Sequence, residues 1–147
     1  MKIGIDFGTC YSWIAVLAGA RPAVAPFEEL CENNAGIPSA FLYSSDGREL
    51  FGIECSGAIG AEQNSEIIRD MKRIVRKNPK DLNKLIVSNN KSFTIKDVLE
   101  KYLRYLVKEA IEKTKAARVV DNTNLEAITI TVPVGLRSGQ MLATDYN

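Results

Sequence analysis

The sequence contains no histidine, and this absence removes several kinds of catalytic site from consideration. Without an imidazole there is no Ser-His or Cys-His nucleophile pair, and most zinc chemistry is excluded as well. The three cysteines, Cys10, Cys31 and Cys55, are far apart and form no C-x-x-C pair. Neither a disulfide framework nor a zinc site is therefore expected. Any catalysis must use carboxylates, lysines, hydroxyls and backbone groups.

Long hydrophobic runs and an excess of one charge are also lacking. No apolar stretch approaches the length of a membrane span, and the net charge is only +1 at pH 7. We therefore expect no membrane and no nucleic acid as a partner. The basic stretch 72–84 has no interleaved aromatic residues, which also argues against a nucleic-acid surface. Because a strand pattern begins directly after Met1, no signal peptide is expected, and the predicted location is cytoplasmic.

What is present is an ordinary globular composition with clear strand patterns near the N-terminus. The chain has 147 residues, 46% hydrophobic and 25% charged, which suffices for one domain with a core. Apolar residues alternate along 2–7, which places Ile3, Ile5 and Phe7 on one face and Asp6 on the other. Further strands at 12–17 and, more weakly, at 23–27 would complete a three-stranded antiparallel meander.

The remainder of the chain alternates between short strands and helices. Strands are predicted at 40–43, 49–51, 85–88, 91–93 and 125–132, and helices at 59–63, 67–75, 95–111 and from 138 onward. A capping box at Thr94 and Asp97 marks the start of the clearest helix. The strand at 125–132 is expected to lie parallel beside the meander. Because the last helix would extend for only about two turns, we expect a truncated domain.

The stretch IGIDFGTCYSWIAV carries a carboxylate, a glycine and a hydroxyl between two apolar strands. Gly8 would let a ligand approach the backbone, and the amides of Gly8, Thr9, Cys10 and Tyr11 could form an anion nest. The Thr9 hydroxyl adds a neutral donor, and Asp6 could hold Mg²⁺ through water. A plain hairpin with a type I turn explains the same residues about equally well. No Walker P-loop is present.

Four stretches, in order, resemble the seventy-kilodalton heat-shock chaperones, the DnaK-like family of the actin-like ATPase superfamily. IGIDFGTCYS is similar to the family's I-G-I-D-L-G-T-T-x-S, and IPSAFLY to its T-P-S-x-V-x-F. MKRIVRK is similar to A-K-R-L-I-G, and AITITVPVGLRSGQMLAT to A-V-I-T-V-P-A-Y-F-N-D-x-Q-R-x-A-T. The resemblance covers essentially the whole chain, and the last stretch separates chaperones from sugar kinases and actins.

The resemblance implies an α/β fold of the ribonuclease-H-like, actin-like ATPase type, with a mixed sheet, an antiparallel meander and flanking helices. The chain would be an incomplete first lobe of that fold. Residues 1–38 and 115–147 would form the subdomain that holds the phosphate loop, and 39–114 an inserted subdomain. The implied activity is Mg²⁺-dependent hydrolysis of ATP to ADP by a stress-response chaperone.

The resemblance also implies roles for individual residues. Asp6 matches the magnesium-proximal aspartate, Thr9 the hydroxyl near the γ-phosphate, and Gly8, Thr9, Cys10 and Tyr11 the loop that cradles ATP or ADP. Lys72 matches the lysine essential for hydrolysis, so that Lys72, Asp6 and Thr9 are the candidate catalytic residues. Without the resemblance, Lys72 would be interpreted as a solvated lysine on a basic helix face.

The sequence departs from the family pattern in several places. Cys10 replaces the usual threonine of the loop, and 134–136 replaces Ala-Tyr-Phe. The uncharged Met141 stands where the family has arginine. In the family, that arginine takes part in signalling between domains. The second phosphate loop, D-x-G-G-G-T, the adenosine segment G-G-x-[ST]-R and a peptide-binding domain do not occur. We therefore expect a fragment that binds ATP poorly and self-associates. A longer parent would bind unfolded polypeptides, a J-domain co-chaperone and a nucleotide exchange factor.

Two other interpretations stay open from the sequence. The chain could belong to another actin-like ATPase, such as a reactivating factor or a cell-shape or division protein, since these share the D-x-G-T loop. It could also be a non-catalytic partial lobe that binds a partner. A peptide-binding domain in the same polypeptide would discriminate the chaperone from both.

Overall fold

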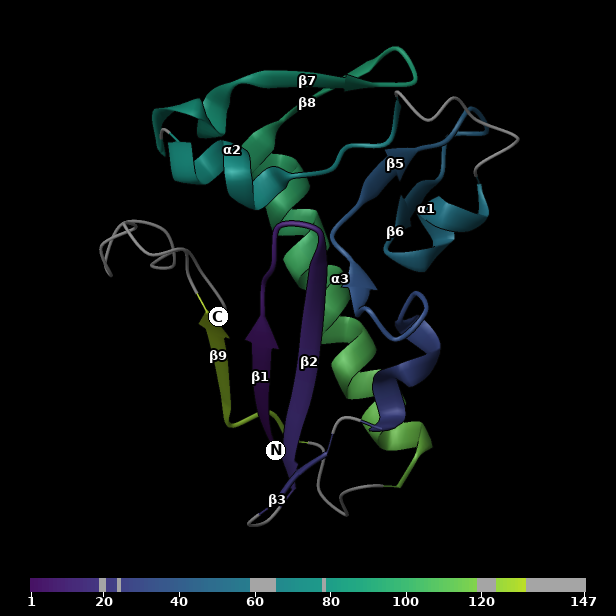
Figure 1. The fold of residues 1–147 in the computed structure, drawn as a ribbon, viewed down its shortest axis with the longest axis vertical. Helices are drawn as coiled ribbons and strands as arrows, with labels where there is room; N and C mark the ends of the chain where they lie inside the picture. Colours follow the sequence, from purple (N-terminus) through teal and green to yellow (C-terminus); the bar gives the residue numbers. More distant parts are fainter. Residues whose placement is uncertain (19–20, 24, 59–65, 78, 119–123, 132–147) are drawn as a thin grey trace.

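The protein has a mixed α/β architecture in which one twisted sheet packs against a long helix (Figure 1). The computed structural model describes residues 1–18, 21–23, 25–58, 66–77, 79–118 and 124–131. The strands are β1 (Lys2–Asp6), β2 (Tyr11–Ala18), β3 (Arg21–Ala23), β4 (Ile37–Pro38), β5 (Phe41–Tyr43), β6 (Glu49–Phe51), β7 (Leu85–Ser88), β8 (Lys91–Thr94) and β9 (Ala127–Thr131). The α-helices are α1 (Ile53–Gly57), α2 (Met71–Lys77) and α3 (Ile95–Ala116), and the 3-10 helices are η1 (Ala25–Leu30) and η3 (Pro79–Asn83).

The main sheet has the strand order β3-β2-β1-β9, and β4 pairs with the other end of β2. β1 runs antiparallel to β2, with Ile3 opposite Val16, and parallel to β9, with Ile3 opposite Ile128. The antiparallel order of the first three strands and the parallel position of the late strand are confirmed, but the third strand lies at Arg21–Ala23 and not at 23–27. The mixed pairing makes β1 the central strand, so its end is flanked by structure on both sides.

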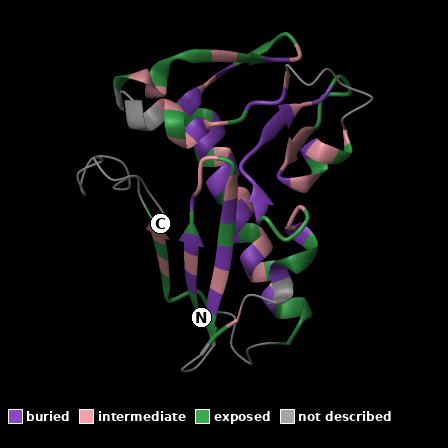
Figure 2. Cartoon of the chain, viewed as in Figure 1, coloured by how far each residue is buried: buried purple, intermediate pink, exposed green. Residues whose placement is uncertain are grey.

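The hydrophobic core lies between the sheet and α3. Ile3, Ile5 and Phe7 are buried and Asp6 is exposed, as the alternation predicted. In Figure 2 the buried positions concentrate where β1 and β2 face α3. The buried face of α3 consists of Ile95, Val98, Leu99, Tyr102, Leu103, Leu106, Val107, Ala110 and Thr114. At its centre the Tyr102 hydroxyl donates a hydrogen bond of 2.9 Å to the Pro38 carbonyl, which ties α3 to β4.

The predicted capping box is present at the start of α3. The Thr94 hydroxyl accepts a hydrogen bond of 3.0 Å from the Asp97 amide, and the Asp97 carboxylate accepts one of 3.1 Å from the Thr94 amide. Two amides that the helix leaves without partners are thereby satisfied. None of the helices in the described ranges is both long and apolar enough to cross a bilayer.

The prediction of a strand at 23–27 is wrong, because β3 ends at Ala23 and η1 begins at Ala25. A 3-10 helix has three residues per turn, so residues three apart share a face. Phe27 and Leu30 have this spacing and are both buried. Burial of these two side chains together outweighs the weak strand propensity of the segment.

The helix predicted at 67–75 is wrong at its start, because α2 begins only at Met71. Ile68 instead pairs with Phe41, and their backbones exchange hydrogen bonds of 3.0 and 2.8 Å. Asp70 then has a φ of 58°, which an α-helix does not allow. α1 was not predicted, and the helices predicted at 59–63 and from 138 onward lie outside the described residues.

Replacing Thr94 with alanine should lower the free energy of unfolding by about 1 kcal/mol at pH 7, because the N-cap oxygen is lost. Ser92→Ala, an exposed hydroxyl on the neighbouring strand, is the matched control and should cost under about 0.5 kcal/mol. Urea denaturation measures both values.

The effect of Thr94→Ala should also depend on pH. Hydrogen bonds from Thr94 lower the pKa of the Asp97 carboxyl. A carboxylate with a lowered folded pKa stabilises the fold above its unfolded pKa and loses that effect as the pH falls through the folded value. The deficit of the variant should therefore shrink below about pH 4. Equal deficits at pH 7 and at pH 3 would contradict this account.

Candidate functional site

The turn between β1 and β2 is closed very tightly at Gly8. A Cβ atom built on Gly8 would lie 1.8 Å from the Tyr11 carbonyl oxygen, so no other residue fits without movement of the backbone. The sequence had suggested that this glycine admits a ligand. The structure shows a more local reason, since the close neighbour is the loop's own backbone.

Ser39, the residue after β4, holds the loop formed by residues 7–10. The Ser39 hydroxyl donates a hydrogen bond of 3.0 Å to the Gly8 carbonyl and lies 2.9 Å from the Ser12 hydroxyl. The Ser39 amide donates a second bond, of 2.8 Å, to the Cys10 carbonyl. Both serines are buried. Sequence reasoning quoted IPSAFLY for its resemblance but assigned Ser39 no role, because a serine carries no signal of its long-range partner.

The amides of the loop are not used in this arrangement. Two loop carbonyls are satisfied by Ser39, but within the described ranges the amides of Gly8, Thr9 and Cys10 donate to no backbone group. Thr9 is half-buried and Cys10 is exposed. Three consecutive amides without a backbone partner are thus available as hydrogen-bond donors at this turn, although no residue of 8–10 has the positive φ typical of an αR-αL nest.

Tyr11 differs from the other predicted loop residues. It is the first residue of β2 and pairs with Pro38 of β4. Its hydroxyl donates a hydrogen bond of 3.2 Å to the Glu32 carboxylate, which raises the pKa of the Tyr11 hydroxyl. The side chain therefore anchors the end of the loop to the segment that follows η1.

Asp6 lies at the exposed end of β1, directly before the loop. One oxygen of its carboxylate accepts a hydrogen bond of 2.6 Å from the Thr131 hydroxyl, since Thr131 stands opposite Asp6 in the parallel pair of β1 and β9. The second oxygen has no partner among the described residues. An exposed carboxylate with a free oxygen suits Mg²⁺, which prefers hard oxygen ligands and keeps several waters. Sequence reasoning missed Thr131, which only the strand register brings to this position.

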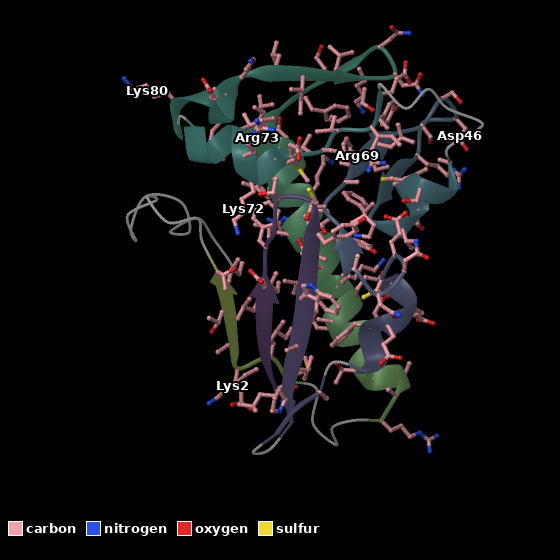
Figure 3. All side chains as sticks on the ribbon, in the orientation of Figure 1. Lys2, Asp46, Arg69, Lys72, Arg73 and Lys80 are labelled. Atoms are coloured by element: carbon pink, nitrogen blue, oxygen red, sulfur yellow. The ribbon has the colours of Figure 1, made fainter. Side chains whose placement is uncertain are left out.

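Lys72 reaches the same loop from α2. Its ammonium donates a hydrogen bond to the Phe7 carbonyl and lies 5.9 Å from the centre of the Phe7 ring. Figure 3 shows Lys72 below α2, near the end of β1 where the loop begins, whereas the neighbouring Arg73 is exposed. Lys72 is thus half-buried and paired, unlike a fully solvated lysine.

The structure therefore brings the predicted residues together at one end of β1. The loop at 7–10 lies beside the Asp6 carboxylate and the Lys72 ammonium, and it contributes the three amides that have no backbone partner. Ser39 binds the loop from the buried side. Free amides and a cation can bind phosphate oxygens, and the carboxylate can hold a hydrated divalent ion beside them. In the described part of the chain, no three histidine, cysteine, aspartate or glutamate side chains form a closed metal site.

A groove of about 690 Å³ lies elsewhere, along α3 beside β6. Charged side chains line much of it, and the Lys101 ammonium donates to both oxygens of Glu49 at 2.7 and 2.9 Å. None of its lining residues belongs to the loop at 7–10, so the groove is separate from the candidate site.

No protein-family model matches the chain.

Replacing Gly8 with alanine should lower the free energy of unfolding by about 2 to 3 kcal/mol, because the added methyl group forces the turn open. Gly57→Ala is the matched control, since a Cβ there meets nothing within 4 Å. The control should leave stability unchanged or raise it by up to about 1 kcal/mol. Equal stability of the two variants in urea denaturation would show that the turn is not tightly closed.

Proposed function

We propose that this chain forms the phosphate-binding side of a Mg²⁺-dependent ATPase site of the actin-like type, in a protein resembling the seventy-kilodalton heat-shock chaperones. The observation that supports the proposal most directly is the contact between the Lys72 ammonium and the Phe7 carbonyl. These residues are 65 positions apart in the chain. A lysine that is merely on the surface would not be expected to contact the loop that carries the other candidate residues.

The proposed roles follow from the chemistry of each group. The amides of Gly8, Thr9 and Cys10 bind phosphate oxygens, and Asp6 holds the hydrated Mg²⁺. A Mg²⁺ ion held there would supply positive charge to the phosphates. The Lys72 ammonium, which contacts the Phe7 carbonyl in this structure, would bind the γ-phosphate and stabilise the charge that spreads over the transferred group.

The arrangement of elements supports a ribonuclease-H-like fold. β9 returns beside β1 after a long inserted segment that contains α2, which carries Lys72. We propose that 1–38 and 115–147 form one subdomain and 39–114 the insertion, with α3 as the link between them. The last residues of the chain, including 134–136 and Met141, lie outside the described residues.

The chaperone part of the proposal is supported only by the four resembling stretches. A longer parent would act in the cytoplasm on unfolded polypeptides, with a J-domain co-chaperone and a nucleotide exchange factor. Its opposite lobe would supply the adenosine pocket. Trp13 and Leu17, with 43% and 37% of their surfaces exposed on the outer side of β2, support the expected self-association of the chain alone.

The chain alone should bind Mg-ATP weakly, with a dissociation constant of about 1 mM, since it offers phosphate contacts from one side only. Lys72→Ala should weaken this binding several-fold, whereas Arg73→Ala, the exposed neighbour on α2, should not. Isothermal titration calorimetry measures both. Micromolar affinity of the chain alone would contradict the half-site, and equal affinities of the two variants would contradict the role of Lys72.

In the longer polypeptide that supplies the opposite lobe, Lys72→Ala should lower ATP turnover by about 100-fold while leaving the unfolding midpoint unchanged. Arg73→Ala in the same protein is the control for loss of a positive charge on α2. Turnover at the parental rate in the Lys72 variant would remove the catalytic part of the proposal.

A further inference from the structure

Among the strands in the described part of the molecule, β7 exposes the most apolar side-chain surface. Leu85 and Val87 have 64% and 59% of their surfaces exposed, more than the other large hydrophobic residues that the structure describes. They are two positions apart and therefore share one face of the strand. β7 and β8 form a two-stranded ribbon at the upper end of the molecule in Figure 1.

The backbone of β7 has free hydrogen-bonding groups on that edge. In the pairing with β8, the Lys84 carbonyl accepts from the Ile95 amide, so alternate residues of β7 direct their groups toward β8. Leu85 and Val87 direct theirs away from it. Within the described ranges, neither residue has a backbone partner on the outer side. An apolar edge with free donors and acceptors is a template for another strand.

The ribbon is held rigidly enough to serve as such a template. The Ser88 hydroxyl donates a hydrogen bond of 2.8 Å to the Glu66 carbonyl and accepts one of 3.0 Å from the Tyr43 amide. The Phe93 ring packs edge-on against the Phe41 ring, with 5.1 Å between the ring centres. A strand that is already ordered costs less entropy on binding.

The charge around the ribbon favours an acidic partner. Residues 70–97 contain eight lysines and arginines but three acidic residues, although the whole chain has a net charge of only +1. Lys84, which directly precedes β7, is exposed and forms no ion pair with a described residue. Negative charges flanking an incoming strand would therefore be attracted to this end of the molecule.

A second copy of the chain fits this edge poorly. Two copies paired at this edge would bring the same excess of positive charge together, which opposes their association. Nucleic acid would satisfy the charge but would use neither the free amides nor the apolar side chains. A peptide uses all three features.

We propose that the outer edge of β7 binds an extended peptide segment of a partner protein as an additional strand. The segment carries apolar side chains at alternate positions, which lie beside Leu85 and Val87, and acidic residues at its ends. This site is separate from the loop at 7–10 and does not depend on the nucleotide proposal.

The test is an NMR titration of the ¹⁵N-labelled chain with the capped hexapeptide Glu-Leu-Thr-Val-Thr-Glu. The amide signals of Leu85 and Val87 should shift, with a dissociation constant of about 0.1 mM. Val87→Pro removes the donor at an edge position that tolerates proline and should weaken binding at least about tenfold. Val87→Thr keeps the donor and should weaken it by less than about threefold.

Lys84→Glu, an exposed change that leaves the edge intact, tests the charge even if the proline variant fails to fold. The Lys84→Glu change should weaken binding of the acidic hexapeptide. It should strengthen binding of a basic control peptide, Lys-Leu-Thr-Val-Thr-Lys. The proposal is overturned by no binding at 2 mM peptide, or by equal binding of the two peptides. The proposal is also overturned if the β7 signals shift with protein concentration alone, which would mean that two copies pair. A further contrary result is binding of an oligothymidylate, used as a nucleic-acid probe, without binding of either peptide.

Discussion

The tight turn after β1 is the constraint on which the candidate site depends. Its backbone approaches itself so closely at Gly8 that a side chain there would meet the Tyr11 carbonyl. Ser39, on the buried side, donates hydrogen bonds to the Gly8 and Cys10 carbonyls. The carbonyls of Gly8 and Cys10 are therefore satisfied inside the molecule, whereas the amides of Gly8, Thr9 and Cys10 have no backbone partner in the described ranges. In the proposed function, these amides bind phosphate oxygens.

The charges around this turn come from parts of the chain that are distant in sequence. β9 brings Thr131 to the Asp6 carboxylate through a parallel strand pair. α2 brings Lys72 to the Phe7 carbonyl from the inserted segment. The Asp6 carboxylate at the start of the turn and the Lys72 ammonium at the Phe7 carbonyl thus place one charge of each sign beside the loop. A hydrated magnesium ion bound to phosphates would satisfy both groups at once.

Much of the fold could be predicted from local patterns, and the misses have a physical cause. Alternation along β1 and the spacing along α3 are strong signals, and both elements were predicted. The segment at 67–70 has helical spacing, but Ile68 is drawn into a backbone pairing with Phe41, and no local pattern reports such a partner. The site shows the same division. Asp6, Gly8 and Thr9 stand in one short motif, whereas Ser39 and Thr131 act through long-range contacts that the sequence does not display.

The most direct test of the account uses magnesium tripolyphosphate, which carries the phosphates of ATP without the adenosine. In an NMR titration of the chain, the account predicts that the amide signals of Gly8, Thr9 and Cys10 shift together. The Lys72→Ala variant should show smaller shifts at the same concentrations. Shifts confined to exposed basic residues such as Arg73, with the loop signals unchanged, would contradict the central claim that this turn binds phosphate.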